Sequence, residues 1–248
     1  MRELLEQVLT IAKEADRAIM AVYGRAFDVT VKMDNSPLTE ADQAAHRVIL
    51  RGLQALSLTY PILSEEDVAG FSGVGQDGRY WLVDPLDGTK EFIKRNDEFT
   101  VNIALIEHGV PILGVVTAPA LGTAYIAAED VGAFSIDAEG KHHAIQVAGK
   151  PSPGAVWRVL GSRSHSNPAL SAWLDKLGAY DIQPLGSSLK SCLIAEGKAD
   201  VYPRLGPTSL WDTAAAHAVV RYAGGRVETL EGQPLSYANP FRTLNPPF

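Results

Sequence analysis

The sequence predicts an α/β protein in which residues 1–150 are α+β and residues 151–248 are α/β. Near the N-terminus, apolar residues recur every three or four positions, as they do along one face of a helix. Two apolar runs then meet at His108-Gly109, which indicates an antiparallel hairpin. In the second half, strand-like and helical segments alternate, as in a sheet covered by helices. We expect the two halves to be sub-lobes of one domain, 1–248.

The elements of the first half follow from this periodicity. A first helix spans residues 4–22 and ends near Gly24, and a second begins at Thr39, which forms a capping box with Asp42. Short apolar runs predict strands over residues 60–63, 80–83, 99–106, 111–118, 125–128 and 132–136. Pro85 has no N–H for a sheet, so we expect it to end the second of these strands.

The second half begins at Lys150-Pro151-Ser152-Pro153-Gly154, the clearest break in composition. After this junction the pattern predicts a strand, a helix, a strand, a helix, a strand and a helix, in that order. They span residues 156–160, 169–177, the neighbourhood of Ile182, 188–195, 199–202 and 211–223.

The composition limits the class of protein. Hydrophobic residues make up 46% of the chain and charged residues 21%, which is ordinary for a globular protein with a core. The net charge of −7 argues against a nucleic acid polymer as partner. No apolar run is long enough to span a membrane, and the single cysteine, Cys192, excludes an internal disulfide. We expect a cytoplasmic protein, free or peripheral to the inner membrane, that is a monomer or a homodimer.

The most informative segment is WLVDPLDGTKEF, residues 81–92. An apolar strand delivers Asp84 at its end, and Asp87 follows three positions later. Carboxylates projecting from a strand end suit Mg²⁺, which prefers oxygen ligands. Gly88 and Thr89 come where a helical turn could begin, and free N–H groups at a helix start attract phosphate. Metal and phosphate together indicate phosphoryl chemistry.

Each acidic motif also has a purely structural interpretation. A lone D-x-x-D-G is typical of a turn, and Glu65 in the acidic run after residues 60–63 fits a solvated loop. Asp212 opens a helix after Trp211 and fits a capping box with Ser209, as Asp42 does with Thr39. The spacing of the first motif suits two metal ligands better than a nucleophile with its general acid.

Taken together, these motifs resemble the signature of the inositol monophosphatase superfamily, which comprises Mg²⁺-dependent, lithium-inhibited phosphomonoesterases. The resemblance implies a layered αβαβα sandwich. Within that superfamily the chain is most similar to the bacterial 3′(2′),5′-bisphosphate nucleotidases of the CysQ type, which remove the 3′-phosphate of adenosine 3′,5′-bisphosphate. This closer likeness lies in residues 34–42, 87–95, 162–165, 186–190 and 201–204, and it is weaker over 68–79 and after Val227.

The resemblance implies two or three Mg²⁺ ions. One would be held by Glu65, Asp84 and the carbonyl oxygen of Leu86, and a second by Asp84, Asp87 and Asp212, with Asp84 bridging. Clustered carboxylates repel one another without cations, so we expect the metal-free site to be poorly ordered or partly protonated.

The resemblance also implies roles in catalysis and substrate binding. Thr89, paired with Asp42, would orient the attacking water and help remove its proton. The residues implied to contact substrate are Gly88, Thr89, Lys90, His165, Ser187, Lys190, Arg204 and Asp212. Among them Lys190 and Arg204 would hold the second phosphate and the ribose region, whereas His165 fits either a nucleotide contact or a loop cap.

Two other functions stay open for the same residues. An inositol or sugar phosphate phosphatase would use the same metal ligands, because fold and metals do not determine substrate. Lys90-Glu91-Phe92, together with Lys190 and Arg204, favours a ligand with a second charged group. A non-catalytic nucleotide-binding sensor would keep the fold without turnover, but all the implied ligands and Thr89 are present. The expected partner is therefore a small phosphorylated nucleotide.

Overall fold

A central sheet organises the computed structural model, which describes residues 1–31, 37–162 and 168–248. The sheet has seven strands in the order β3-β4-β5-β6-β7-β8-β9, and only β3 and β4 run parallel to each other. These strands are β3 (Ile62–Ser64), β4 (Arg79–Asp87), β5 (Thr100–Glu107), β6 (Val110–Ala118), β7 (Thr123–Ala128), β8 (Gly132–Ile136) and β9 (His142–Ala144). A 3₁₀ turn, η1 (Pro119–Leu121), connects β6 to β7.

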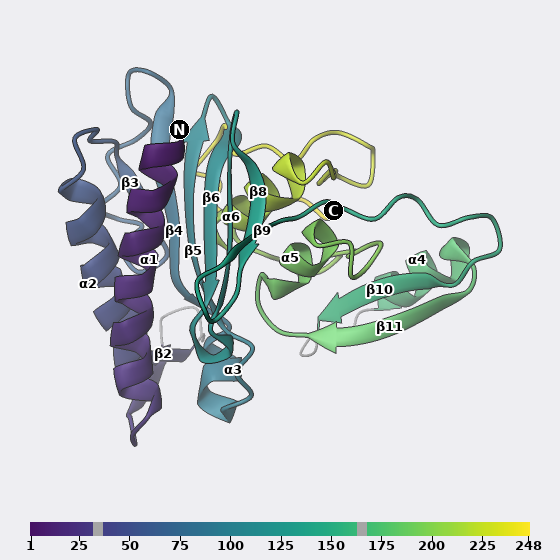
Figure 1. Ribbon diagram of the computed structural model, residues 1–248, viewed down its shortest axis with the longest axis horizontal. Coiled ribbons are helices and arrows are strands. Elements are labelled where there is room, and N and C mark those ends of the chain that lie inside the picture. Colours follow the sequence, from purple (N-terminus) through teal and green to yellow (C-terminus); the bar gives the residue numbers. More distant parts are fainter. Residues whose placement is uncertain (32–36, 163–167) are drawn as a thin grey trace.

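Helices cover both faces of this sheet. The helices α1 (Arg2–Tyr23) and α2 (Glu40–Gln54) pack on one face, and α6 (Leu210–Tyr222) packs on the other beside α5 (Leu189–Ala195) (Figure 1). Because successive side chains of a strand point to opposite faces of the sheet, alternate residues of β4 belong to two different hydrophobic cores. Trp81 and Val83 pack with α1 and α2, whereas Tyr80 and Leu82 pack with α5 and α6. Burial on both faces explains why residues 80–83 of β4 form an unbroken apolar run rather than alternating with polar residues.

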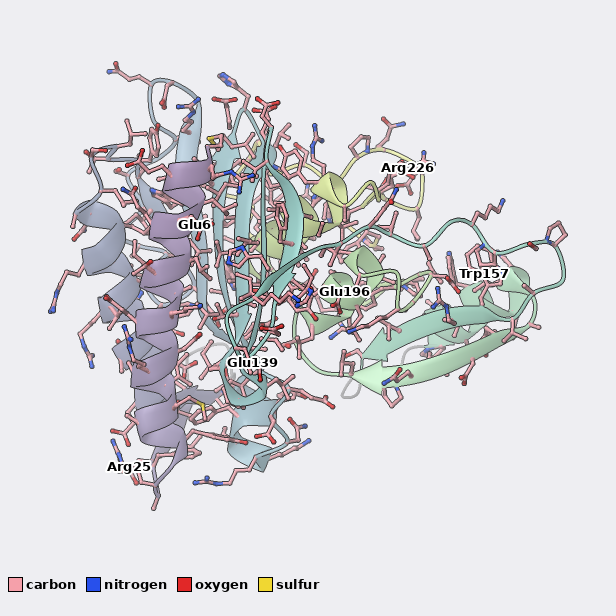
Figure 2. All side chains as sticks on the ribbon, viewed as in Figure 1. Glu6, Arg25, Glu139, Trp157, Glu196 and Arg226 are labelled. Atoms are coloured by element: carbon pink, nitrogen blue, oxygen red, sulfur yellow. The ribbon has the colours of Figure 1, made fainter. Side chains whose placement is uncertain are left out.

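A second, smaller sheet lies beyond α5 and α6 (Figure 1). Its strands β10 (Trp157–Ser162) and β11 (Tyr180–Leu185) are parallel, and α4 (Pro168–Leu177) provides the crossover that parallel strands require. Figure 2 shows Glu6 of α1 and Trp157 of β10 on opposite sides of the molecule. The succession of helices, sheet, helices and second sheet confirms the predicted mixed α/β class.

Three short elements complete the description of the first half. The strands β1 (Val29–Val31) and β2 (Pro37–Thr39) pair with each other, and α3 (Thr89–Lys94) follows β4. In the described part of the chain, no helix is long and apolar enough to cross a membrane.

Two expectations about strands were wrong. Pro85 does not end β4, because the pairing with β5 shifts register between Asp84 and Asp87, and such a bulge needs no N–H from the proline. No full strand forms over residues 199–202. Only Val201 makes an isolated bridge to β10, and Pro203, two positions later, has no N–H to extend the pairing.

Candidate active site

The turn between β4 and α3 brings a strand end and a helix start together. Gly88, the N-cap of α3, has φ 89° and ψ 39°, a left-handed conformation that favours glycine. A Cβ at this position would lie 3.1 Å from the Glu98 carbonyl oxygen, so a side chain would be both strained and crowded. This turn places Asp87 and Thr89 on either side of Gly88, at the same edge of the sheet.

A cavity of about 270 Å³ opens at this edge, between residues of both halves of the chain. Most of the residues implied by the resemblance line it: Glu65, Asp84, Leu86, Asp87, Gly88, Thr89, Lys90, Ser187, Lys190, Arg204 and Asp212. Asp42 does not line the cavity but is buried behind Thr89. His165 lies outside the described residues, and so do Asp34, Asn35 and Ser36 of the first motif.

Asp84 is the most deeply buried carboxyl of the cavity, with 1% of its surface exposed. Its Oδ1 accepts a hydrogen bond from the Leu86 N–H at 3.0 Å. Glu65 is held nearby because its N–H donates to the Val83 carbonyl oxygen, and its side chain hydrogen-bonds Asp84. Burial raises the pKa of Asp84 well above its ordinary value, and the neighbouring carboxylates add to this effect.

Asp87 is held by polar groups from β5 and from the loop before α5. Its Oδ2 accepts from the Ser188 N–H at 2.6 Å, from Thr100 Oγ1 at 3.4 Å and from Asn102 Nδ2 at 3.5 Å. Burial raises the pKa of Asp87 to about 6, although the positive charge of Lys190 acts in the opposite direction. A charged Asp87 therefore depends on this surrounding set of donors.

Asp212 lies in the first turn of α6 and serves as a cap as well as a cavity residue. Its Oδ2 accepts from the Ser209 N–H at 2.9 Å, so the capping box is present. Burial and the charge of Asp87 raise the pKa of Asp212 to about 8. The two interpretations weighed for Asp212 are thus compatible, because one oxygen caps the helix while the side chain lines the cavity.

The cavity fits a hard divalent cation by its chemistry. Glu65, Asp84, Asp87 and Asp212 supply only oxygen ligands, and three of them have raised pKa values partly because their charges repel one another. Added positive charge would relieve this repulsion. Across residues 1–31, 37–162 and 168–248, no three His, Cys, Asp or Glu side chains are already arranged around one ion position.

Thr89 links the helices α2 and α3. Its hydroxyl lies 3.3 Å from Asp42 Oδ1 and 3.3 Å from the Leu86 carbonyl oxygen, and it can donate to one of them at a time. The other oxygen of Asp42 accepts from the N–H and the hydroxyl of Thr39, both at 2.7 Å. The Asp42 side chain thus holds Thr89 at the cavity while it completes the capping box of α2.

Lys190 and Arg204 form the cationic side of the cavity, and both are buried. Lys190 Nζ donates to the carbonyl oxygens of Leu185 at 3.1 Å and Ser187 at 2.5 Å, so only one of its three donors is left for a ligand. Burial lowers the pKa of Lys190 to about 8. Arg204 Nη2 donates to the Pro207 carbonyl oxygen, whereas its buried Nε has no partner among the described residues.

Several residues of the site were missed at the level of sequence. Ser188, Thr100 and Asn102 surround Asp87, and Ser188 Oγ also lies 2.7 Å from Asn102 Oδ1. The sequence of β5 contains one feature that could have indicated two of them. Thr100 and Asn102 are polar residues two positions apart on a strand that is apolar from Ile103 to Ile106, so both point to the same face.

The chain is similar to known proteins along almost its whole length. The chain is 51% identical over 247 residues to the 3'(2'),5'-bisphosphate nucleotidase CysQ of Escherichia coli (strain K12), covering 99% of this chain and 98% of that protein. It is 36% identical over 251 residues to the protein of the same name from Haemophilus influenzae, covering 99% and 91%.

Solved structures of the same fold are similar along the whole chain. The crystal structure of CysQ from Bacteroides thetaiotaomicron, a bacterial member of the inositol monophosphatase family, superposes with a TM-score of 0.82 at 36% identity, covering 100% of this chain and 96% of that one. An inositol monophosphatase from Anabaena superposes with a TM-score of 0.77 at 25% identity, covering 98% and 89%. The model of the inositol monophosphatase family matches residues 1–245, and the chain therefore belongs to that family.

Proposed function

We propose that this protein is a Mg²⁺-dependent phosphomonoesterase that hydrolyses the 3′-phosphate of adenosine 3′,5′-bisphosphate to give AMP and phosphate. Enzymes of its family are metal-dependent phosphatases, generally with Mg²⁺. One observation carries the proposal: a single cavity joins a cluster of four carboxyls to two buried cations, Lys190 and Arg204. The carboxyls suit metal ions at the phosphate that leaves, and the cations suit a second phosphate that stays.

The acidic side of the cavity would hold the metals. Glu65, Asp84 and the Leu86 carbonyl oxygen are the proposed ligands of one ion, and Asp84, Asp87 and Asp212 those of a second. Two or three ions in all are proposed. When bound, such ions lower the pKa of a water and stabilise charge on the attacking and leaving oxygens.

Thr89 and Asp42 are proposed to handle the attacking water. The Thr89 hydroxyl would accept a hydrogen bond from the water and so direct an oxygen lone pair at phosphorus. Thr89 lies 3.3 Å from Asp42, whose carboxylate can receive the proton that the water loses. The oxygen–phosphorus bond to water forms as the bond to the 3′ oxygen breaks, and the 3′ oxygen takes up a proton. The N–H groups of Gly88 and Thr89 would hold the phosphate.

The remaining cavity residues are proposed to hold the rest of the nucleotide. The free donor of Lys190 and the unpaired Nε of Arg204 would bind the second phosphate, with the Ser187 hydroxyl beside them. Lys90 lines the cavity as a further cation. A nucleotide contact by His165 stays a prediction. The sub-lobe 1–150 would then provide most of the metal ligands, and the sub-lobe 151–248 the substrate contacts and Asp212.

The decisive experiment compares released phosphate from four substrates with Mg²⁺ present: adenosine 3′,5′-bisphosphate, AMP, inositol phosphate and fructose bisphosphate. The proposal expects the highest kcat/KM for adenosine 3′,5′-bisphosphate. A preference for inositol or sugar phosphates would favour the alternative phosphatase, and binding of nucleotide without release of phosphate would favour the sensor. A cytoplasmic location, peripheral attachment to the inner membrane, and a monomeric or homodimeric state stay predictions.

A further inference from the structure

The segment 243–248 runs antiparallel to residues 204–210, which form one wall of the cavity. The Phe248 N–H donates to the Arg204 carbonyl oxygen at 3.0 Å, and the Arg204 N–H donates to the Phe248 carbonyl oxygen at 2.6 Å. Further along, the Asn245 N–H donates to the Thr208 carbonyl oxygen at 2.9 Å, and the Leu210 N–H to the Thr243 carbonyl oxygen at 2.8 Å. The wall has no regular structure of its own until α6 begins, so these bonds determine where its main chain lies.

Asn245 connects this segment to the helix turn that carries Asp212. Its side chain has 9% exposure, and its Nδ2 lies 2.7 Å from the Ser209 carbonyl oxygen and 3.1 Å from Thr213 Oγ1. Ser209 in turn donates its N–H to Asp212. The first turn of α6 is thus held from outside by Asn245 and from inside by Asp212.

Phe248 acts at the other end of the wall. Its ring packs edge-on against Tyr202, with centroids 6.1 Å apart, and Lys190 Nζ lies 5.3 Å from the centroid of the same Tyr202 ring. Among the described residues, the guanidinium of Arg204 donates one hydrogen bond, to the Pro207 carbonyl oxygen of its own loop. The direction of the Arg204 side chain therefore depends on the main-chain position that Phe248 sets.

We propose that Asn245 and Phe248 are positioning residues of the active site: Phe248 sets Arg204 for the second phosphate, and Asn245 sets the α6 turn so that Asp212 can bind a cation. The inference rests on the proposed function, because it assigns Arg204 and Asp212 those ligands. Neither positioning residue touches substrate, since neither lines the cavity. Substitutions of Asn245 and Phe248 should therefore affect substrate and cation binding only by displacing Asp212 and Arg204.

A double-mutant cycle tests the Phe248 half. Phe248→Pro removes the ring and the N–H that donates to the Arg204 carbonyl oxygen. We expect kcat/KM for adenosine 3′,5′-bisphosphate to fall about tenfold, with that for 3′-AMP nearly unchanged. In an Arg204→Ala background, Phe248→Pro should cause no further loss of kcat/KM, because the guanidinium that Phe248 is proposed to position is absent. Phe241→Ala, at 72% exposure in the same region, is the control and should leave both substrates unaffected.

The outcomes separate the inference from the function beneath it. If Arg204→Ala alone weakens both substrates equally, the proposed function fails. If Arg204→Ala is selective but Phe248→Pro adds its full effect to it, the positioning role fails and the function stands. Should Phe248→Pro not fold, Phe248→Ala, which removes only the ring, should still give a smaller selective loss of about threefold. Equal losses on both substrates would overturn the positioning role.

Calorimetric titration with Mg²⁺ tests the Asn245 half without any measurement of turnover. We expect Asn245→Ala to weaken Mg²⁺ binding about tenfold, as the loss of a residue that orients a metal ligand does. Asn239→Ala, a substitution in an exposed turn of the same region, should bind Mg²⁺ as the wild type does. If Asn245→Ala lowers the melting temperature but leaves the Mg²⁺ affinity unchanged, Asn245 is structural only and the proposal is wrong.

Discussion

The Ser188 N–H donates to Asp87 Oδ2 at 2.6 Å and thereby joins two points that are 101 residues apart in the chain. Asp87 belongs to the acidic side of the cavity, whereas Ser188 precedes α5 and follows the loop that Lys190 holds. A proposed metal ligand is therefore hydrogen-bonded to the residue that follows Ser187, which is proposed to lie beside the second phosphate. Substitutions on the acidic side should alter Mg²⁺ binding, whereas substitutions on the cationic side should alter hydrolysis only of substrates with a second phosphate.

Replacing Asp84 by asparagine should abolish activity while the fold is retained. Asp84 is the proposed ligand that both metal ions share, and its amide isostere loses the negative charge without loss of volume. Because burial already opposes ionisation of this carboxyl, the neutral variant should unfold at the same temperature as the metal-free wild type or higher. Phosphate release and a melting curve check both parts. Retention of more than a few percent of wild-type turnover would contradict the shared-ligand assignment.

Removing the Thr100 hydroxyl should weaken cation binding without removing any proposed ligand. Thr100 Oγ1 lies 3.4 Å from Asp87 Oδ2 and 2.9 Å from Ser188 Oγ, so Thr100→Val breaks the network that orients Asp87. We expect the Kd for Mg²⁺ to rise about tenfold. Thr123→Val on β7 is the matched control. A Kd that is unchanged for Thr100→Val would show that Asp87 is oriented without Thr100.

The cationic residues should affect only substrates with a second phosphate. Loss of a charge-assisted hydrogen bond costs about 1.5–3 kcal/mol, or roughly ten- to a hundredfold in kcat/KM. Lys190→Ala or Arg204→Ala should weaken hydrolysis of adenosine 3′,5′-bisphosphate by that factor and leave 3′-AMP nearly unchanged. Lys176→Ala, an exposed lysine of α4, is the control. Equal losses on both substrates would favour a general phosphomonoesterase.

Because Lys190 holds two carbonyl oxygens, those of Leu185 and Ser187, its variants carry a larger structural risk than variants of Arg204, which holds one. A melting temperature for each variant separates the two contributions. If Lys190→Ala is strongly destabilised while Arg204→Ala is not, the selectivity should be judged on Arg204→Ala alone.

Asp16 should make stability depend on pH far from the cavity. Burial between α1 and β6 raises the pKa of Asp16 from 3.8 to about 7, although Thr117 donates a hydrogen bond to it. The folded protein then keeps a proton that the unfolded chain releases near pH 4. The stability that Asp16 contributes is complete below pH 4 and is lost as the pH rises to about 7.

Asp16→Asn is neutral at every pH and should therefore gain stability over the wild type as the pH rises. We expect the difference in melting temperature between variant and wild type to be larger at pH 8 than at pH 5. Asp175→Asn, which makes the same substitution at an exposed position of α4, is the control. The cavity carboxyls are present in both variant and wild type, so the comparison isolates Asp16. An equal difference at both pH values would contradict the raised pKa.

The sequence by itself determined the elements and the chemistry of the central turn. Helical periodicity predicted α1 and α2, and the order Asp84, Asp87, Gly88, Thr89 predicted carboxyls beside a helix start, because strand, turn and helix signals are local. The same local logic was wrong at Pro85. A proline excludes a regular ladder, but a bulge avoids the missing N–H, and whether a bulge forms depends on the neighbouring strand β5.

Only the tertiary structure decided how distant residues share one cavity. Thr100, Asn102 and Ser188 surround Asp87 because β5 and the start of α5 converge there, and nothing in the spacing of their segments specifies that convergence. The Lys190 side chain is buried and donates to two loop carbonyl oxygens, and the sequence pattern does not indicate that this lysine is buried. The contact of Phe248 with Arg204 is likewise a pairing of remote main-chain groups, which any two residues can form. The sequence determines which chemical groups the side chains carry, whereas tertiary packing determines which groups they contact.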